Sequence, residues 1–189
     1  MNYYSKYKSK KTIVDGIKFD SKLESNIYLK LKEYKSKFKA NNDLILEKTK
    51  SGVIENIKNN TKELSINVPN HIWNMAVELQ PKYELQEKFK FNGKSIRAID
   101  YTADFKITLL HSYLVTTELK PFQPPLYNTD QYEYIVDAKG METEVFKIKK
   151  KMFIKKYNKD VVIVKSVKQF TQWMDGIIKD LIKEEEINE

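Results

Sequence analysis

The chain of 189 residues lacks cysteine altogether and contains two histidines, His71 and His111. The absence of cysteine excludes disulfide bonds and thiolate metal sites, which fits a reducing compartment. The scarcity of histidine argues against a zinc site or a histidine-dependent catalytic site. Because no apolar run has the length of a signal peptide or a membrane span, we expect a cytoplasmic protein that does not enter a membrane.

Positive charge exceeds negative charge along the chain. Lysine and arginine number 34 against 26 aspartates and glutamates, which gives a formal charge of +8 and a pI of about 9.3. Such a balance is expected of a protein whose partner is rich in phosphate, such as DNA. Nearly all of this charge comes from lysine, so a generally lysine-rich proteome would produce the same balance without any ligand.

The length predicts a single domain over residues 1–189. Residues 1–18 form a basic N-terminal arm in which tyrosines alternate with lysines. Residues 40–80 are polar and rich in asparagine, with one apolar patch, and we interpret them as an insertion. Residues 166–189 are expected to form a C-terminal helix that ends in an acidic tail.

Three helices are predicted from apolar residues at helical spacing. The first runs from Ser21 to about Lys39. The second is capped by Thr143, runs to about Tyr157, and carries Val145, Ile148 and Met152 on its inner side. The third begins at Ser166. The buried stripes of the first and third helices consist of Leu23, Ile27, Leu31, Tyr34 and Phe38, and of Phe170, Trp173, Ile177 and Leu181.

Alternating residues and turn signals predict the strands. Val14 to Gly16 indicates a turn, and Asn92-Gly93 is typical of a tight hairpin. Arg97 to Ile107 alternates as one strand, which would put Tyr101 on the apolar face and Asp104 on the opposite face. Further strands are expected within His111–Leu119, Tyr132–Ala138 and Val161–Val164. The chain is therefore predicted to be an α/β protein with a mixed sheet flanked by helices.

The stretch EYIVDAKG, residues 133–140, ends an apolar strand with an aspartate and a lysine. Asp137 and Lys139 are two residues apart, so they share one face of the strand. Asp104 likewise lies among apolar residues. Buried carboxylates need a compensating positive charge, and a divalent cation with oxygen ligands is the usual partner when histidine is scarce. A buried ion pair, for example with Arg97, would also satisfy Asp104.

Four sequence stretches resemble one nuclease superfamily: FDSKLE at 19–24, YTADF at 101–105, VDAKG at 136–140 and TEVFKIKKKMF at 143–153. Together they resemble the phage-encoded nucleases of the PD-(D/E)xK superfamily. More narrowly, they are similar to a small phage domain of unknown function that is described as Holliday-junction-resolvase-like. The resemblance covers residues 6–38 and 83–165, whereas residues 40–80 and 108–130 depart from it as insertions.

The resemblance implies a restriction-endonuclease-like αβββαβ core and an endonuclease that hydrolyses DNA phosphodiester bonds with Mg²⁺ or Mn²⁺. Asp104, Asp137 and the backbone carbonyl of Ala138 would bind the metal, and Glu24 would complete its shell directly or through water. Lys139 would position or activate water and offset charge on the attacked phosphate. DNA contacts are expected from the second helix and from the sheet, namely from Lys147, Lys149, Lys151 and Gln86. A phage or prophage origin, branched DNA as substrate, a role in DNA recombination and a homodimer complete the expectation.

Three alternatives stay open at this point. Glu118-Leu-Lys120 also ends an apolar run and could replace Asp137 and Lys139, although Pro121 prevents a helix from following it at once. Ser21-x-x-Glu24 is a capping-box pattern, in which the glutamate stabilises a helix end. Finally, the chain could be a catalytically inactive relative that binds nucleic acid or a protein through its basic surface.

Overall fold

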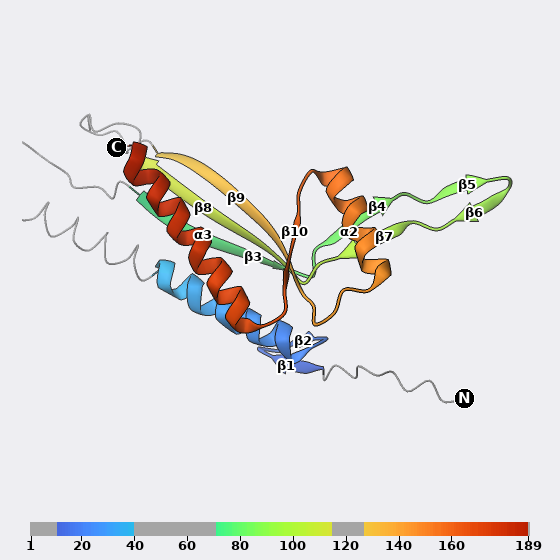
Figure 1. Cartoon of the computed structure of the whole chain (residues 1–189), viewed down its shortest axis with the longest axis horizontal. Helices are drawn as coiled ribbons and strands as arrows, with labels where there is room; N and C mark the ends of the chain where they lie inside the picture. The colour runs from blue at the N-terminus through green and yellow to red at the C-terminus, as the bar shows by residue number, and fades with distance from the viewer. Residues whose placement is uncertain (1–10, 40–70, 115–126, 189) are drawn as a thin grey trace, which may run out of the picture. The chain divides into compact units, whose positions relative to one another are not determined.

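The structure, a computed structural model, describes residues 11–39, 71–114 and 127–188 (Figure 1). Most of the basic arm predicted at residues 1–18, most of the insertion predicted at residues 40–80, and the alternative motif Glu118–Lys120 lie outside the described residues. None of the helices in the described part of the chain is long and apolar enough to cross a membrane.

The described residues form a mixed α/β fold, which confirms the predicted fold class. A four-stranded sheet has the order β10-β9-β8-β3, and three further pairs are β1-β2, β4-β7 and β5-β6. β9 and β10 are parallel. A first helix covers residues 22–39. The other elements are β1 (Thr12–Val14), β2 (Ile17–Phe19), β3 (His71–Leu79), β4 (Lys82–Gln86), β5 (Phe89–Phe91), β6 (Lys94–Ile96), β7 (Ile99–Thr102), β8 (Phe105–Leu114), β9 (Tyr127–Ala138), α2 (Glu144–Tyr157), β10 (Val161–Val164) and α3 (Val167–Asn188).

The chain divides into two compact units. One consists of residues 1–31, 78–106 and 134–189, and the other of residues 32–77 and 107–133. Glu24, Asp104, Asp137 and Lys139 all belong to the first unit. The boundaries fall within β3, β8 and β9 rather than in linkers, so the single domain predicted from length stays a prediction.

Two predicted turns are present as tight hairpin turns. Asp15 and Gly16 have φ of 52° and 75°, and Asn92 and Gly93 have φ of 46° and 74°. Positive φ at both central residues is the conformation that joins two antiparallel strands with the correct twist. The first turn connects β1 to β2 and the second connects β5 to β6.

The strand predicted over residues 97–107 is interrupted between β7 and β8. Ala103 donates its N–H to the carbonyl oxygen of Pro81 (3.1 Å), and Gln80 donates its N–H to that of Asp104 (3.0 Å). Pro81 has no N–H to continue a ladder, and Gln80 adopts a φ of 50°. Both segments therefore change direction at this point, and Asp104 lies at the break rather than inside a continuous strand.

Parts of the two predicted insertions belong to the sheet. β3 lies at the end of residues 40–80, and the described ends of residues 108–130 extend β8 and β9. Trp73, Met75 and Val77 are more buried than Asn74 and Ala76 between them, which is the period-two pattern of a strand with one covered face. The pattern was therefore present in the sequence within the apolar patch.

Helix α2 begins after Thr143 as predicted, because the Thr143 side chain accepts a hydrogen bond from the Phe146 N–H. The predicted inner side of the helix is wrong in part. Phe146 and Phe153 are buried, whereas Val145 and Ile148 are 65% and 59% exposed. The larger aromatic side chains occupy the interface with β4 because they bury more apolar surface.

The core beneath α2 positions the ends of β7 and β9. Its buried residues are Leu85, Tyr101, Ala103, Ile135, Phe146, Phe153 and Val161. The Tyr101 ring packs edge-on against Phe153, with centroids 5.6 Å apart. Truncating a fully buried phenylalanine in such a core costs about 3–5 kcal/mol. The backbone beside the predicted site is therefore held by dense aromatic packing.

Candidate active site

Asp137 and Lys139 lie at the end of β9, in the first unit. Asp137 is fully buried, and its Oδ1 lies 2.7 Å from Nζ of Lys139, whose side chain is 29% exposed. β10 pairs with this segment in parallel, and the Lys139 N–H donates to the Val164 carbonyl oxygen at 3.0 Å. The Lys139 ammonium also lies 4.7 Å from the centre of the Phe146 ring. A carboxylate and an ammonium thus lie side by side at the C-terminal end of β9, as their spacing predicted.

Tyr101 is a site residue that the sequence analysis missed. Its hydroxyl donates a hydrogen bond to Oδ2 of Asp137 at 2.7 Å. Burial, and then the charge of Asp137, raise the pKa of the Tyr101 hydroxyl, so it stays a donor at neutral pH. A continuous strand would put Tyr101 and Asp104 on opposite faces, whereas the break before β8 lets both approach Asp137.

Asp104 lies beside the backbone of Ala138, the residue that follows Asp137. Its Oδ2 accepts a hydrogen bond from the Ala138 N–H at 2.7 Å. Burial, followed by the charges of Asp137 and Glu24, raises the pKa of Asp104 to about 8, although the Ala138 N–H opposes this rise. The described residues provide no salt bridge for Asp104, and Arg97 is exposed rather than paired with it.

Glu24 stabilises the start of the first helix and also affects the site. The Glu24 N–H donates to Oγ of Ser21 at 3.1 Å, and Oε2 of Glu24 accepts from the Asp20 N–H at 3.1 Å. This is the capping arrangement, with Asp20 in place of the cap residue as backbone donor. Glu24 is nevertheless 7% exposed, and its charge contributes to the raised pKa of Asp104. Helix capping and proximity to the acids are therefore compatible.

The donor chemistry fits a hard divalent cation with two carboxylates. Within the described residues, no group of three or more acidic, histidine or cysteine side chains is arranged to hold a metal ion. Mg²⁺ needs fewer protein ligands than that, because it usually keeps several waters and binds through one or two carboxylates plus substrate phosphate. Asp104 and Asp137 could supply this smaller set. A contribution of Glu24 through water stays a prediction.

One carboxylate oxygen of Asp137 has no well-aligned hydrogen-bond donor. Its Oδ1 is fully buried, yet it accepts no hydrogen bond of ordinary geometry from a described residue. The ammonium of Lys139 is close to this oxygen, but the contact is Coulombic rather than directional. The Lys139 ammonium offsets the charge of this oxygen, and the lone pairs that have no aligned donor would be available to a divalent cation.

A pocket of about 370 Å³ opens beside Ala138 and Lys139, and neither Asp104 nor Asp137 is among its lining residues. Glu24, Lys139 and Phe146 line it, and so do Ser21 and Thr143, which cap the first helix and α2. Helix N-termini carry partial positive charge and favour anions. The pocket therefore combines one ammonium and two helix starts with the carboxylates of Asp20 and Glu24, so a phosphate group would need a cation beside these acids.

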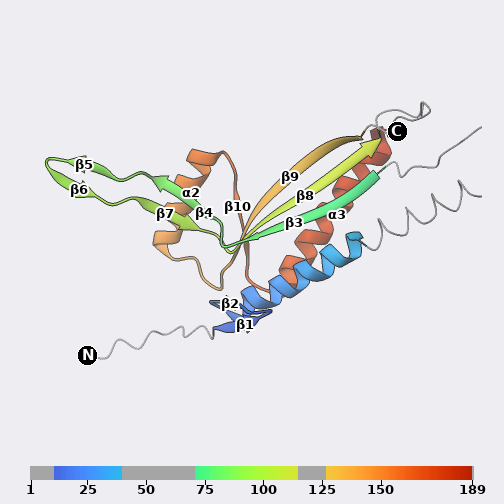
Figure 2. The ribbon, with the colours of Figure 1, turned by 180° about the vertical axis from the view of Figure 1, so that it is seen from behind.

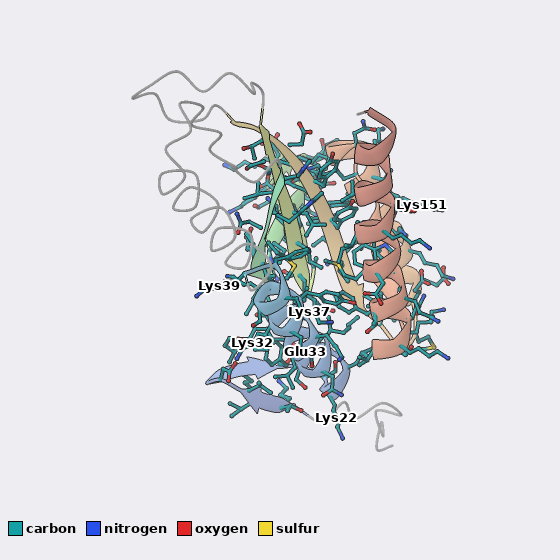
Figure 3. All side chains as sticks on the ribbon, turned by 90° about the vertical axis from the view of Figure 1, so that its left-hand side faces the viewer. Lys22, Lys32, Glu33, Lys37, Lys39 and Lys151 are labelled. Carbon is teal, nitrogen blue, oxygen red and sulfur yellow. The ribbon has the colours of Figure 1, made fainter. Side chains whose placement is uncertain are left out.

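The predicted DNA-contacting residues differ in their surroundings. Lys149 donates to the carbonyl oxygen of Asp100 at 2.7 Å, and Lys147 pairs with Glu144 at 2.7 Å. Lys151 is exposed, forms no hydrogen bond or ion pair with a described residue, and points outward from α2 (Figure 3). Gln86 is half-buried at the end of β4, in register with Ile99. Lys151 is thus the most available of the four.

A family model matches residues 4–48, 61–123 and 121–171, which together exceed half of the chain. That family is described as "Protein of unknown function (DUF1064)". The chain belongs to this family. No curated protein and no solved structure gives a significant match. The matched regions include the first helix, the break before β8 and the Asp137–Lys139 segment. They therefore contain all of the candidate site residues described above.

Proposed function

We propose that this DUF1064 protein is a metal-dependent endodeoxyribonuclease of the PD-(D/E)xK type. The observation that carries the proposal is the fully buried Asp137 carboxylate, which lies 2.7 Å from Lys139. Burial, followed by the charges of Asp137 and Glu24, raises the pKa of Asp104 to about 8. Two carboxylates forced together beside one ammonium are costly for a fold alone. Clusters of this kind are concentrated at functional sites.

Each site residue has a distinct role in this proposal. Asp104 and Asp137 would hold Mg²⁺ or Mn²⁺ with the Ala138 carbonyl oxygen, and Tyr101 would fix the rotamer of Asp137 through its hydrogen bond. The cation would supply an acidic bound water and polarise the phosphate. Lys139, which lines the pocket, would position the water and offset negative charge as it develops on the phosphate.

Exposed lysines in each of the two units support DNA as the substrate. Lys151 is exposed on α2, and Lys22, Lys32, Lys37 and Lys39 are exposed along the first helix (Figure 3). Contacts of this kind bind phosphate without reading sequence. We therefore propose branched DNA as the specific substrate on the resemblance to resolvases alone, together with a phage or prophage origin, a cytoplasmic site of action and a homodimer that makes paired cuts.

The test measures cutting of supercoiled plasmid and of a labelled four-way junction in Mg²⁺, Mn²⁺ or EDTA. The wild-type protein is expected to cut only with metal, and Asp137→Asn is expected to lower the rate at least about 100-fold. Asp160→Asn is the matched control, because Asp160 is an exposed carboxylate paired with Lys150 at 3.0 Å. It should cut at the wild-type rate.

The other outcomes separate the alternatives. Loss of cutting in Glu118→Gln, with Asp137→Asn unaffected, would move the site to the motif at residues 118–120. Binding of DNA without cutting by any form, in any metal, would show an inactive binding module. Sedimentation of the wild-type protein as a monomer, both alone and on a four-way junction, would contradict the homodimer.

A further inference from the structure

The β5–β6 hairpin is a two-stranded ribbon whose six strand residues are all exposed. It extends beyond β4 and β7, and no other described element of the first unit lies beside it in the two opposite views (Figures 1 and 2). Three of the six are large apolar residues: Phe91 is 63% exposed, Phe89 42% and Ile96 37%. An isolated hairpin gains little stability from such residues, so their exposure asks for another reason.

The register of the ribbon collects the apolar residues on one face. Phe89 is paired with Ile96, and Phe91 is paired with Lys94. Residues directly opposite in an antiparallel pair share a face, and alternate residues of one strand share it too. Phe89, Phe91, Ile96 and Lys94 therefore form one aromatic face with a cation near the Asn92-Gly93 turn. Lys90 and Ser95 form the other face.

The ribbon and its flanks are also positively charged. Residues 87–97 contain four cations and one anion, which gives a net charge of +3 (4 − 1). None of the four makes an ion pair with a described residue. By contrast, Lys82, Lys147 and Lys156 are all paired with carboxylates. The unpaired cations of the ribbon are Lys88, Lys90, Lys94 and Arg97.

We propose that this ribbon binds unpaired bases of the DNA substrate, with Phe89 and Phe91 as stacking platforms and the lysines on adjacent phosphates. The inference rests on the proposed nuclease function for the identity of the nucleic acid. Every base has an aromatic face, so stacking on phenylalanine binds exposed bases regardless of sequence. A two-stranded ribbon is also narrow enough to enter a DNA groove or a gap in a helix.

Charge complementarity favours nucleic acid over a second copy of the chain. The buried centre of a protein–protein interface is depleted of lysine, whereas Lys94 lies on the aromatic face itself, opposite Phe91. Two copies joined through this face would bring like charges together. A polyanion with planar apolar groups matches both properties of the ribbon.

The test measures binding of fluorescein-labelled single-stranded DNA and of a blunt duplex by anisotropy, in EDTA so that cutting plays no part. Phe91→Ala is expected to weaken single-strand binding about 10-fold or more and duplex binding less. Phe91→Tyr, which keeps an aromatic face, should bind like the wild type. The matched control is Val145→Ala on α2, because Val145 is 65% exposed and Phe91 63%.

Three results would overturn the proposal. The first is unchanged single-strand affinity in Phe91→Ala, or an equal loss on duplex. The second is a change of sedimentation coefficient in Phe91→Ala, which would show that a second copy covers the face. The third is a large loss of thermal stability in Phe91→Ala, which would show that another segment of this chain covers it.

A parallel cutting assay in Mg²⁺ separates failure of this inference from failure of the proposed function. Metal-dependent cutting with unchanged affinity in Phe91→Ala would remove the ribbon's role and leave the nuclease. Stacking-dependent affinity without any cutting would remove the nuclease and leave a protein that binds single-stranded DNA.

Discussion

Asp137 is fully buried, whereas Phe91, in the same compact unit, has 63% of its surface exposed. Aspartate is among the residues that proteins bury least, and phenylalanine is among those that they bury most. The end of β9 therefore buries a residue that is usually exposed, and the β5–β6 ribbon exposes residues that are usually buried. Both arrangements oppose stability, and a negatively charged, aromatic ligand together with a cation would compensate both. A buried carboxylate and an exposed aromatic ring in one unit can thus be explained by one ligand.

The largest expected effect is a dependence of stability on pH, caused by Asp104 beside the end of β9. Because the pKa of Asp104 is raised to about 8, the native state holds a proton that the unfolded state has lost above its ordinary pKa. The free energy of unfolding of the metal-free protein should therefore fall between pH 5 and 8, by up to about 4 kcal/mol. Urea unfolding at several pH values measures this.

Two controls sharpen that result. Asp104→Asn should abolish most of the pH dependence, whereas Asp160→Asn should retain it. Millimolar Mg²⁺ should restore stability at pH 8, because a cation favours the ionised carboxyl group. A stability that rises from pH 5 to 8 in the metal-free protein would contradict the proximity of the two aspartates.

The next effect comes from removing the cation that faces Asp137. Lys139→Met should lower the free energy of unfolding by about 3 kcal/mol, because it leaves a buried carboxylate uncompensated. Lys147→Met is the matched control: its ammonium also lies 2.7 Å from a carboxylate oxygen, but both partners are exposed. That variant should lose almost no stability, because solvent screens an exposed pair. Adding Asp137→Asn to Lys139→Met should recover much of the loss, and equal losses in the two lysine variants would argue against burial as the cause.

A smaller effect is expected from the tyrosine that the sequence did not reveal. Tyr101→Phe removes the donor to Oδ2 of Asp137 and should destabilise the protein by about 1.5 kcal/mol. Tyr28→Phe removes a similar but exposed bond to Asp15, 3.2 Å long, and should have almost no effect. Urea unfolding measures both variants. If Tyr101→Phe kept wild-type stability and wild-type cutting, Tyr101 would have no positioning role.

The smallest effect is expected in the β5–β6 ribbon. Phe91→Ser should change the free energy of unfolding by no more than about 0.5 kcal/mol, because its ring contributes little to the fold. Phe153→Ala, in the core, should cost about 3–5 kcal/mol. Thermal unfolding of the two variants distinguishes them, and comparable losses would mean that the ring of Phe91 is covered.

Local signals predicted the local structure well. Thr143 caps α2 and Asn92-Gly93 turns the hairpin, because both depend on residues a few positions apart. The pairing of Asp137 with Lys139 was also predictable, since two residues of one strand share a face. These features need no knowledge of distant contacts.

What the sequence could not supply depended on tertiary contacts. The prediction of the inner face of α2 was wrong in part. Val145 and Ile148 follow helical spacing as well as Phe146 and Phe153 do, and only packing on β4 selects which pair is buried. Tyr101 was missed because the strand breaks before β8. That break arises from backbone hydrogen bonds of Ala103 and Asp104 to Pro81 and Gln80. The raised pKa of Asp104 likewise depends on its burial and then on the charges of Asp137 and Glu24, which are distant in sequence.

The parallel pairing of β9 with β10 has a consequence for the order in which the protein matures. The Lys139 N–H is held by the Val164 carbonyl oxygen, 25 positions later (164 − 139). A growing polypeptide that has passed Lys139 thus already contains Glu24, Asp104 and Asp137 but has no strand to anchor the backbone of Lys139. The backbone of Lys139 can make this hydrogen bond only after β10 has been synthesised, so a chain truncated before Val164 would contain all three acids without this anchor.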